Sequence, residues 1–237
     1  TFLAIIGIAT ACATMICSGF FQDCIDYMVH IHFVLSQKQD MTLAFVEPTS
    51  HKAIYELKRM EGINNGEAFR SVPVRMTFGH RSYKTVINGI QQDSHLSILL
   101  DRNLKSIPIP ESGILLTDYL GKILGVKAGD MLTVEALEGS KTVRQVPVVA
   151  LAKQYLGVMG YMNLNALNRL MNEGDAISGA YLVTDEHYRE KLFRSFVQMP
   201  RVSEIVVRQN EIRSIYDVMA KAMLFFMFIA SLMASSI

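Results

Sequence analysis

The residues that could do chemistry lie mostly near the start of the chain. Three cysteines, Cys12, Cys17 and Cys24, precede two histidines, His30 and His32. Histidines two positions apart point to opposite sides of a helix, so they could form a metal pair only if this segment were a strand. Cysteines in an apolar segment commonly act as small apolar fillers. No cysteine follows residue 24, which excludes a disulfide framework or a cysteine metal site in the rest of the chain.

Two carboxylates, Asp23 and Asp26, share one helix face just after the first apolar segment. Paired carboxylates can serve acid–base catalysis, but solvated charges at a membrane boundary give the same pattern. The sequence contains no P-loop of the form GxxxxGKS or GxxxxGKT, and no GxSxG, HExxH or CxxC motif. We therefore expect no catalytic residue, no metal site and no cofactor site in this chain.

One segment has a composition that suits binding rather than catalysis. Residues 155–162 are apolar, contain two glycines and are rich in methionine and tyrosine. Methionine adapts its shape to irregular partners, so the segment could be a mobile loop that meets a lipidic substrate or a partner protein. A connector packed against the core is the alternative. The candidate contact residues are Tyr155, Leu156, Val158, Met159, Tyr161 and Met162.

Uncharged apolar segments occupy both ends of the chain. No charged residue precedes Asp23, and none follows Lys221. A helix needs ~20 apolar residues to cross a hydrocarbon core, so residues 1–22 are expected to form a transmembrane helix. Residues 211–237 are expected to form a stalk and the start of a second, truncated one, which makes the sequence a fragment. A secretory signal peptide is the alternative for the first segment.

Small residues recur along one side of the first apolar segment and would let another helix approach closely. Lipid-facing small residues without a partner would give the same pattern. The helical spacing of apolar residues continues beyond this segment, so residues 23–38 are expected to extend the helix as a stalk. The helix-packing stripe consists of Ala4, Gly7 and Ala11.

The residues between the two ends predict an α+β domain. The segment from Val72 to Phe78 alternates apolar and polar residues, as a half-buried strand does. Gly79 and His80 form a two-residue link that suits a hairpin with a leading glycine. Residues 83–90 are therefore expected to return as the partner strand.

A β-α-β pattern in the first half of this domain, residues 39–107, recurs in residues 178–210. A shift of 139 positions places Leu57 on Phe196, and four further pairs of apolar residues align at the same shift. Any two amphipathic helices align in this way, but the similar order of the flanking strands favours a duplicated β-α-β unit. Two such units would form one sheet with helices on one face. Residues 108–177 are expected to be a small β-rich subdomain inserted between the two halves.

The layout of essentially the whole chain resembles a known family. It is similar to the first transmembrane helix and extracytoplasmic core domain of FtsX-like (MacB-type) ABC transporter permeases, and three stretches of sequence carry the likeness. In that family a short helix and a Lys-x-Gly-Asp type of turn lead into a β-rich subdomain. The motifs consist of turns and apolar positions and include no catalytic signature. The stretches are residues 113–120 (GILLTDYL), residues 124–130 (LGVKAGD), and residues 161–171 (YMNLNALNRLM) followed by Gly174 and Asp175.

The resemblance implies a porter-like duplicated domain with the inserted subdomain, flanked by two transmembrane helices, in a multi-pass protein of the bacterial plasma membrane. The central domain would be extracytoplasmic. A separate cytoplasmic ABC ATPase would bind ATP, and the helices would transmit its movement to this domain. Membrane lipids, a second permease subunit and an extracytoplasmic protein are the implied partners. Family roles include release of lipoproteins and handling of other lipids, peptides and macrolides, and regulation of cell-wall hydrolases.

Two other classes of function remain open. A membrane-anchored sensor or interaction module without an ATPase would have the same layout. An anchored enzyme would need a catalytic constellation, which the sequence does not contain. The net charge is +1 and no basic tract occurs, which excludes the electrostatic footprint of a nucleic-acid-binding protein.

Overall fold

The computed structural model describes residues 2–100, 104–139, 141–152 and 157–235. The chain divides into two compact units. The helical unit consists of Thr1–Val34 and Arg208–Ile237, and the sheet unit consists of Leu35–Val207. Each end of the sheet unit is therefore joined directly to the helical unit.

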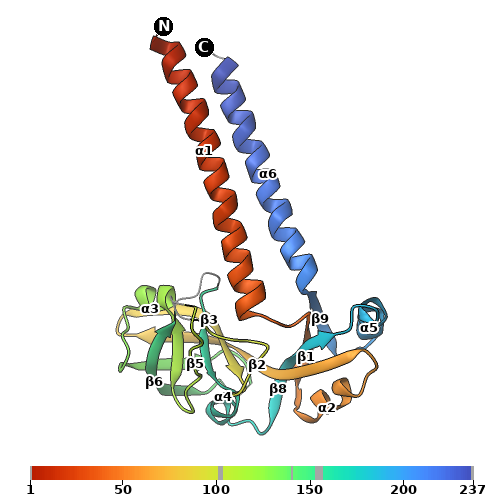
Figure 1. Ribbon diagram of the computed structural model, residues 1–237. Helices are drawn as coiled ribbons and strands as arrows, with labels where there is room; N and C mark the ends of the chain where they lie inside the picture. Colours follow the sequence, from red (N-terminus) through yellow and green to blue (C-terminus); the bar gives the residue numbers. More distant parts are fainter. Residues whose placement is uncertain (1, 101–103, 140, 153–156, 236–237) are drawn as a thin grey trace. The chain divides into compact units, whose positions relative to one another are not determined.

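The helical unit is a pair of helices, α1 (Phe2–His30) and α6 (Arg208–Ser235), which lie side by side with the start of α1 and the end of α6 at the same end (Figure 1). Apolar residues pack between them, and the Tyr216 hydroxyl donates a hydrogen bond of 2.8 Å to the Asp26 carboxylate. Among the described residues no helix is both long and apolar enough to span a membrane. The transmembrane helices predicted for residues 1–22 and 211–237 are therefore not confirmed. The packed residues are Ile25, Val29 and Phe33 against Ile212, Ile215 and Met219.

The two helices connect to the sheet unit in different ways. The α-helical hydrogen bonding of α1 ends at His30, and the chain continues as a π-helix, η1 (Ile31–Ser36). The predicted stalk over residues 23–38 is therefore not one uninterrupted α-helix. Short π-helical turns are rare and often lie at functional positions. At the other end, strand β9 (Val202–Val207) runs into α6 with no residue between them.

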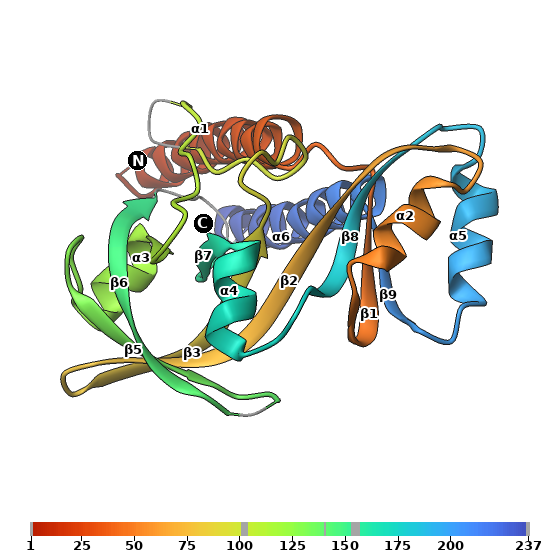
Figure 2. The same cartoon turned by 90° about the horizontal axis from the view of Figure 1, so that it is seen from below.

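The described residues of the sheet unit form nine strands in one sheet, in the order β3-β7-β4-β6-β5-β2-β8-β1-β9, with a further pairing between β3 and β2. Four short helices pack against it (Figures 1 and 2). The remaining strands are β1 (Met41–Ser50), β2 (Ile63–Phe78), β3 (Arg81–Ile90), β4 (Ile114–Thr117), β5 (Met131–Ala136), β6 (Val143–Ala152), β7 (Gly160–Asn163) and β8 (Ala176–Thr184). The helices are α2 (Lys52–Lys58), α3 (Asp118–Leu124), α4 (Leu164–Met171) and α5 (Arg189–Val197).

Six of the strands close into a barrel. The pairings run from β2 to β3, β7, β4, β6 and β5, and β5 pairs again with β2. Side chains of α3 and α4, including Leu120, Leu124 and Leu167, complete the barrel core. The predicted β-rich subdomain thus extends beyond residues 108–177, because β2 and the hairpin strand β3 also belong to it. The hairpin itself is confirmed: Gly79 has a φ of 57° and Phe78 faces Arg81.

The other part of the sheet, called the open half, consists of the first part of β2 with β8, β1 and β9. Helices α2 and α5 lie next to each other on one face of it (Figure 2). Apolar side chains of both helices and of the strands form one core cluster. The buried members are Met41, Leu43, Ile54, Leu57, Ala180, Leu182, Leu192 and Phe196.

The strand pairings of the open half repeat at the shift of 139 positions. The pair Met41–Val207 on β1 and β9 becomes Ala180–Ala68 on β8 and β2, and all five pairs between β1 and β9 have such an equivalent. The register shift in each ladder falls at the same place. The two β-α-β units thus share strand order, register and bulge about an approximate twofold axis. Their origin by duplication and their correspondence to porter-like subdomains stay predictions.

Candidate functional site

The segment that the sequence marked as a binding loop is largely part of the barrel. Tyr161 and Met162 lie in β7 and are 7% and 2% exposed. Val158 and Met159 are partly buried and pack against core clusters. The described part of the segment therefore follows the connector alternative, and a binding role stays a prediction. Tyr155 and Leu156 lie outside the described residues.

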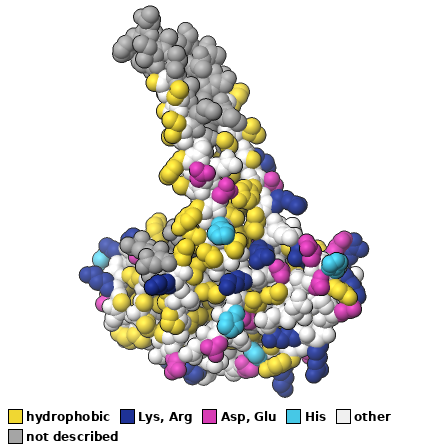
Figure 3. Space-filling view, viewed as in Figure 1, with side chains coloured by type: hydrophobic (Ala, Val, Ile, Leu, Met, Phe, Trp, Pro, Cys, Tyr) yellow, Lys and Arg dark blue, Asp and Glu magenta, His cyan; other side chains and the backbone are white. Residues whose placement is uncertain are grey.

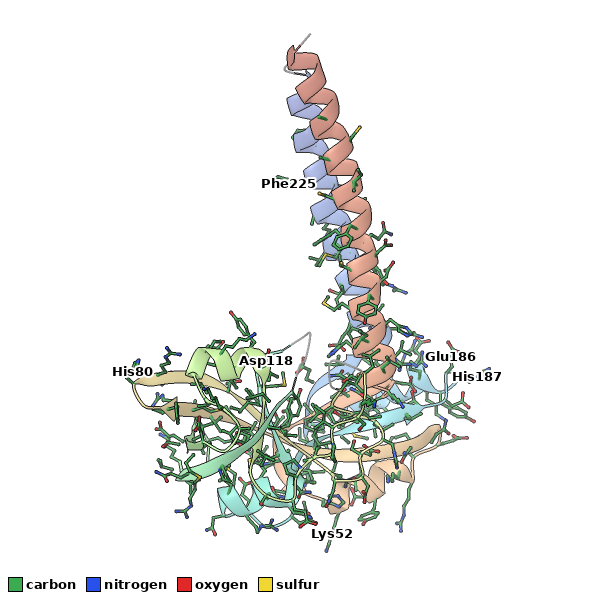
Figure 4. All side chains as sticks on the ribbon, turned by 60° about the vertical axis from the view of Figure 1, so that its left-hand side comes forward. Lys52, His80, Asp118, Glu186, His187 and Phe225 are labelled. Carbon is green, nitrogen blue, oxygen red and sulfur yellow. The ribbon has the colours of Figure 1, made fainter. Side chains whose placement is uncertain are left out.

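The other residues singled out from the sequence do not converge. Ala4, Gly7 and Ala11 lie in α1, with side chains outside the described part of the structure. His30 ends α1 and His32 lies in η1. Within the described residues, no group of three or more His, Cys, Asp or Glu side chains could hold a metal ion. Figure 4 likewise shows His80, Asp118 and Lys52 on separate parts of the surface of the sheet unit.

Two buried charged side chains lie three residues apart on β2. Arg70 is 1% exposed and Glu67 is 7% exposed, and no other charged residue of the described chain is as deeply buried. A buried charge is tolerated only when it is paired and hydrogen-bonded. The partners of these two side chains therefore show which parts of the fold β2 holds together.

The guanidinium of Arg70 is surrounded by acceptors. It donates to both carboxylate oxygens of Glu173 at 3.0 and 2.9 Å and to Oγ of Ser178 at 2.8 Å. Glu138 lies 2.6 Å from Nη2 as an ion pair. Burial alone would lower the pKa of Arg70, but hydrogen bonds and charges from Glu173 and Glu138 raise it above its usual value. The two-oxygen contact with Glu173 is the strongest geometry available to arginine.

The partners of Arg70 come from separate elements. Glu138 follows β5, Glu173 follows α4, and Ser178 lies on β8. Along β2, the pairing with β8 ends at Phe69 and the pairing with β5 begins at Val74. Arg70 thus lies where β2 passes from the open half into the barrel, and it joins both halves at this point.

A chain of hydrogen bonds leads from this cluster to the predicted binding segment. The Ser178 hydroxyl accepts from the Ser71 amide at 3.1 Å, and the Ser71 hydroxyl donates to Asn88 at 2.9 Å. The Asn88 amide group lies 3.2 Å from the sulfur of Met159. The described end of the segment is therefore linked to the junction between the two halves.

Glu67 lies on the opposite face of β2 and holds the segment that follows β3. Its carboxylate accepts hydrogen bonds from the Ser94 hydroxyl and from the backbone amides of His95 at 2.9 Å and Leu96 at 3.2 Å. On the neighbouring strand, Tyr181 faces Glu67 and stacks on Phe69 with ring centroids 4.5 Å apart. Burial is the main cause that raises the pKa of Tyr181 to about 12; a hydrogen bond with Ser97 works against this rise, and the charge of Glu67 adds to it.

The raised pKa of Tyr181 predicts a loss of stability in strong alkali. A tyrosine whose folded pKa exceeds its unfolded value of 10.0 contributes fully below pH 10, and the contribution is lost as the pH rises towards 12. Over that interval the unfolding free energy should fall by about 2 kcal/mol relative to the Tyr181→Phe variant. Urea unfolding of both proteins at pH 9 and pH 12 measures this difference. An equal pH dependence in the two proteins would contradict it.

The arrangement on β2 holds separate parts of the fold together. Arg70 has its donors engaged by protein groups, and Glu67 is engaged by the segment it holds. The sequence interpretation missed both residues. Arg70 had a detectable signal, because it is in phase with the buried residues Val72, Val74 and Met76. Glu67 had none, since it is on the opposite face and is covered by a segment distant in sequence.

The fold is similar to that of known transporter components. No family model and no curated protein sequence matches the chain. Among solved structures, the periplasmic region of MacB from Actinobacillus actinomycetemcomitans aligns with a TM-score of 0.51 and 12% identity, over 76% of this chain and 94% of that one. The extracellular domain of the noncanonic ABC-type transporter YknZ from Gram-positive bacteria aligns with a TM-score of 0.44 and 12% identity, over 69% and 99%. This chain and the periplasmic region of MacB thus share a mixed α/β fold, which confirms the resemblance inferred from the sequence.

Proposed function

We propose that this chain belongs to the permease subunit of an ABC transporter. It would couple ATP hydrolysis by a separate cytoplasmic ATPase to the handling or export of a substrate outside the cytoplasm. The observation that carries the proposal is the fold shared with the periplasmic region of MacB, which this chain covers over 94% of that region's length. In this proposal the chain itself has no enzymatic activity and binds no nucleotide.

The helical unit supports a location at the bacterial plasma membrane, with the sheet unit extracytoplasmic. Large apolar side chains on both helices are exposed, and Figure 3 shows hydrophobic side chains along this pair. Exposed apolar surface of this extent commonly marks contact with a membrane or a partner. The proposed surroundings of the helices are therefore membrane lipids and further helices, including those of a second permease subunit. The exposed residues include Ile16, Phe20, Leu224, Phe225 and Phe228, each more than half exposed.

The two-ended attachment of the sheet unit supports transmission of movement. The chain enters this unit at Leu35 and leaves it at Val207, and a helix precedes the first residue and follows the second. A relative displacement of α1 and α6 would thus act on the sheet at two places. We propose that movement of the ATPase reaches the sheet unit in this way. Lipoproteins or other lipids are the proposed substrate class.

Co-purification from native membranes tests the proposal. The tagged full-length protein should stay in the membrane pellet after an alkaline carbonate wash, because carbonate removes only peripheral proteins. After detergent extraction it should carry an ABC ATPase that hydrolyses ATP. Release of the protein by carbonate would overturn the membrane location. Retention with a signalling protein and no ATPase would instead favour the sensor class.

A further inference from the structure

The chain enters the sheet unit through a short two-stranded ladder that lies outside the main sheet. The Lys38 amide donates to the Leu96 carbonyl and the Ile98 amide donates to the Ser36 carbonyl, both at 2.8 Å. The Ser36 hydroxyl adds a bond of 2.7 Å to the Ile98 carbonyl, and Gln37 faces Ser97 in an antiparallel bridge. We call residues 36–38 and 96–98 the entry ladder. It is the first structure that the chain meets after η1.

The outer strand of the entry ladder is held by Glu67. The Leu96 carbonyl accepts a hydrogen bond from the Lys38 amide, and the Leu96 amide donates one to the Glu67 carboxylate. One residue therefore takes part in both contacts. The His95 amide and the Ser94 hydroxyl bind the same carboxylate. Hydrogen bonds to a charged acceptor are stronger than those between neutral groups. This buried carboxylate therefore fixes the ladder to β2.

Packing and Glu67 both hold this strand. Leu96 is buried, and a cavity of about 40 Å³ lies beside the segment. Glu67 therefore supplies fixation next to a gap in the packing. The cavity lining includes Gln91, Ser94, Ser97, Ile98, Ser106 and Ile109.

The twofold relation of the open half gives Glu67 a particular position. Helix α6 leaves the sheet directly after Val207, and the shift of 139 positions makes Ala68 on β2 the equivalent of Val207. Glu67 is next to Ala68. Through the entry ladder and Glu67, the N-terminal connection acts on β2 at the point equivalent to where α6 acts on β9.

We propose that Glu67 is a positioning residue for transmission of movement: it fixes the entry ladder to β2, so that displacement arriving through η1 reaches the open half at this point. Without it, the next fixed residue along the chain would be Asp40, whose amide donates to the Leu182 carbonyl at 2.9 Å and whose carboxylate accepts from the Thr184 amide at 3.0 Å. The proposal rests on the proposed function, because it assigns a role within the coupling of helix movement to the sheet unit.

Amide-resolved hydrogen exchange on the full chain in detergent tests the mechanical part. In Glu67→Ala, the amides of His95 and Leu96 lose their acceptor and should exchange faster. The proposal requires the Lys38 and Ile98 amides, which do not touch Glu67, to accelerate by about tenfold or more as well. Glu67→Gln keeps an acceptor and should change the exchange rates of these amides less. Glu135→Gln, at a partly exposed glutamate of the same sheet, is the control. Unchanged exchange at Lys38 and Ile98 would show that Glu67 holds only residues 94–96, and would overturn the proposal.

Transport by the complete transporter tests the functional part. Glu67→Ala should assemble with the ATPase and leave ATP hydrolysis within about twofold of wild type, yet lose most export. A disulfide between Gln37→Cys and Ser97→Cys, placed in Glu67→Ala in a background without Cys12, Cys17 and Cys24, should not restore export under oxidising conditions, because it closes the ladder without fixing it to β2. These positions face each other as a non-hydrogen-bonded pair, where Cα atoms lie about 4.5 Å apart and a disulfide fits.

The outcomes separate the two proposals. If wild type has no ATPase and no export, the proposed function fails. If wild type exports and Glu67→Ala exports equally well, or if closing the ladder with the disulfide restores export, only the role of Glu67 fails.

Discussion

Replacing Arg70 with alanine is expected to lower the unfolding free energy by about 3–5 kcal/mol. The change removes the positive partner that Glu173 and Glu138 share, and both carboxylates then lie together without its charge. It also leaves the Ser178 hydroxyl without its donor from Nη1. Urea unfolding followed by circular dichroism measures the effect, since the chain contains no tryptophan for fluorescence.

Arg75→Ala is the matched control on the same strand. Arg75 forms a single ion pair of 2.7 Å with Glu135, and both side chains are more than a third exposed. An exposed pair contributes about 0–1 kcal/mol. Arg70→Lys should fall between the two alanine variants, because lysine keeps the charge but not the two-oxygen contact. Arg70→Ala and Arg75→Ala with equal stability would contradict the importance given to the buried cluster.

A compensating variant separates lost pairing from lost packing. Changing Arg70 to methionine while both Glu138 and Glu173 become glutamine removes the uncompensated charges and fills much of the volume. Buried ion pairs replaced as a whole by neutral groups are often neutral or stabilising. The triple variant should therefore recover much of the stability that Arg70→Ala loses. Failure to recover would place the cost in packing rather than in electrostatics.

Local patterns in the sequence predicted those parts of the fold that depend on neighbouring residues. Alternation from Val72 to Phe78 and the glycine at position 79 specify a hairpin, because strand period and turn conformation are local properties. The shift of 139 positions came from apolar residues of two helices, and the same shift relates the ladders around them. Helical spacing carries this information because it reflects the buried face.

Closure of the barrel could not be predicted, because it depends on which distant strands pair. Strand β2 has 16 residues and serves two parts of the sheet, whereas alternation shows only that one face is buried. Strand β7 was missed for a related reason. All four of its residues are buried, so it has no alternation, and its glycine and methionine resemble a mobile loop. The interruption of α1 by η1 was also unpredictable, since residues 23–33 contain neither glycine nor proline.

The candidate site also combines a feature that local sequence shows with features that depend on distant residues. Arg70 could have been found by its phase with the buried face of β2, but its partners Glu138 and Glu173 lie far along the chain. Glu67 is polar on a face that the local pattern marks as exposed. Its burial follows from the segment at residues 94–96, which only the tertiary structure brings there. Residues that position distant segments leave little trace in local sequence patterns.

Gly179→Ala is expected to destabilise the protein by about 3 kcal/mol or more, although it adds a single methyl group. Gly179 lies in β8 between β1 and β2, opposite Ala44 on one side and Phe69 on the other. A Cβ atom there would lie 2.2 Å from the carbonyl oxygen of Leu43 and 2.7 Å from the ring of Phe69. The strands on both sides would have to separate, and these strands form the centre of the twofold arrangement.

Gly174→Ala, in the connection just before β8, is the matched control. A Cβ atom at Gly174 meets nothing within 4 Å, so this variant should change the unfolding free energy by no more than about 0.5 kcal/mol. Shortening Phe69 to leucine should not rescue Gly179→Ala, because the closest contact is with the backbone of β1 and no side-chain change removes it. Thermal and urea unfolding of the three variants decide the matter. Rescue by Phe69→Leu, or equal stability of the two alanine variants, would show that β1 and β8 can separate at little cost, and the open half would then be too compliant to carry displacement from one connection to the other.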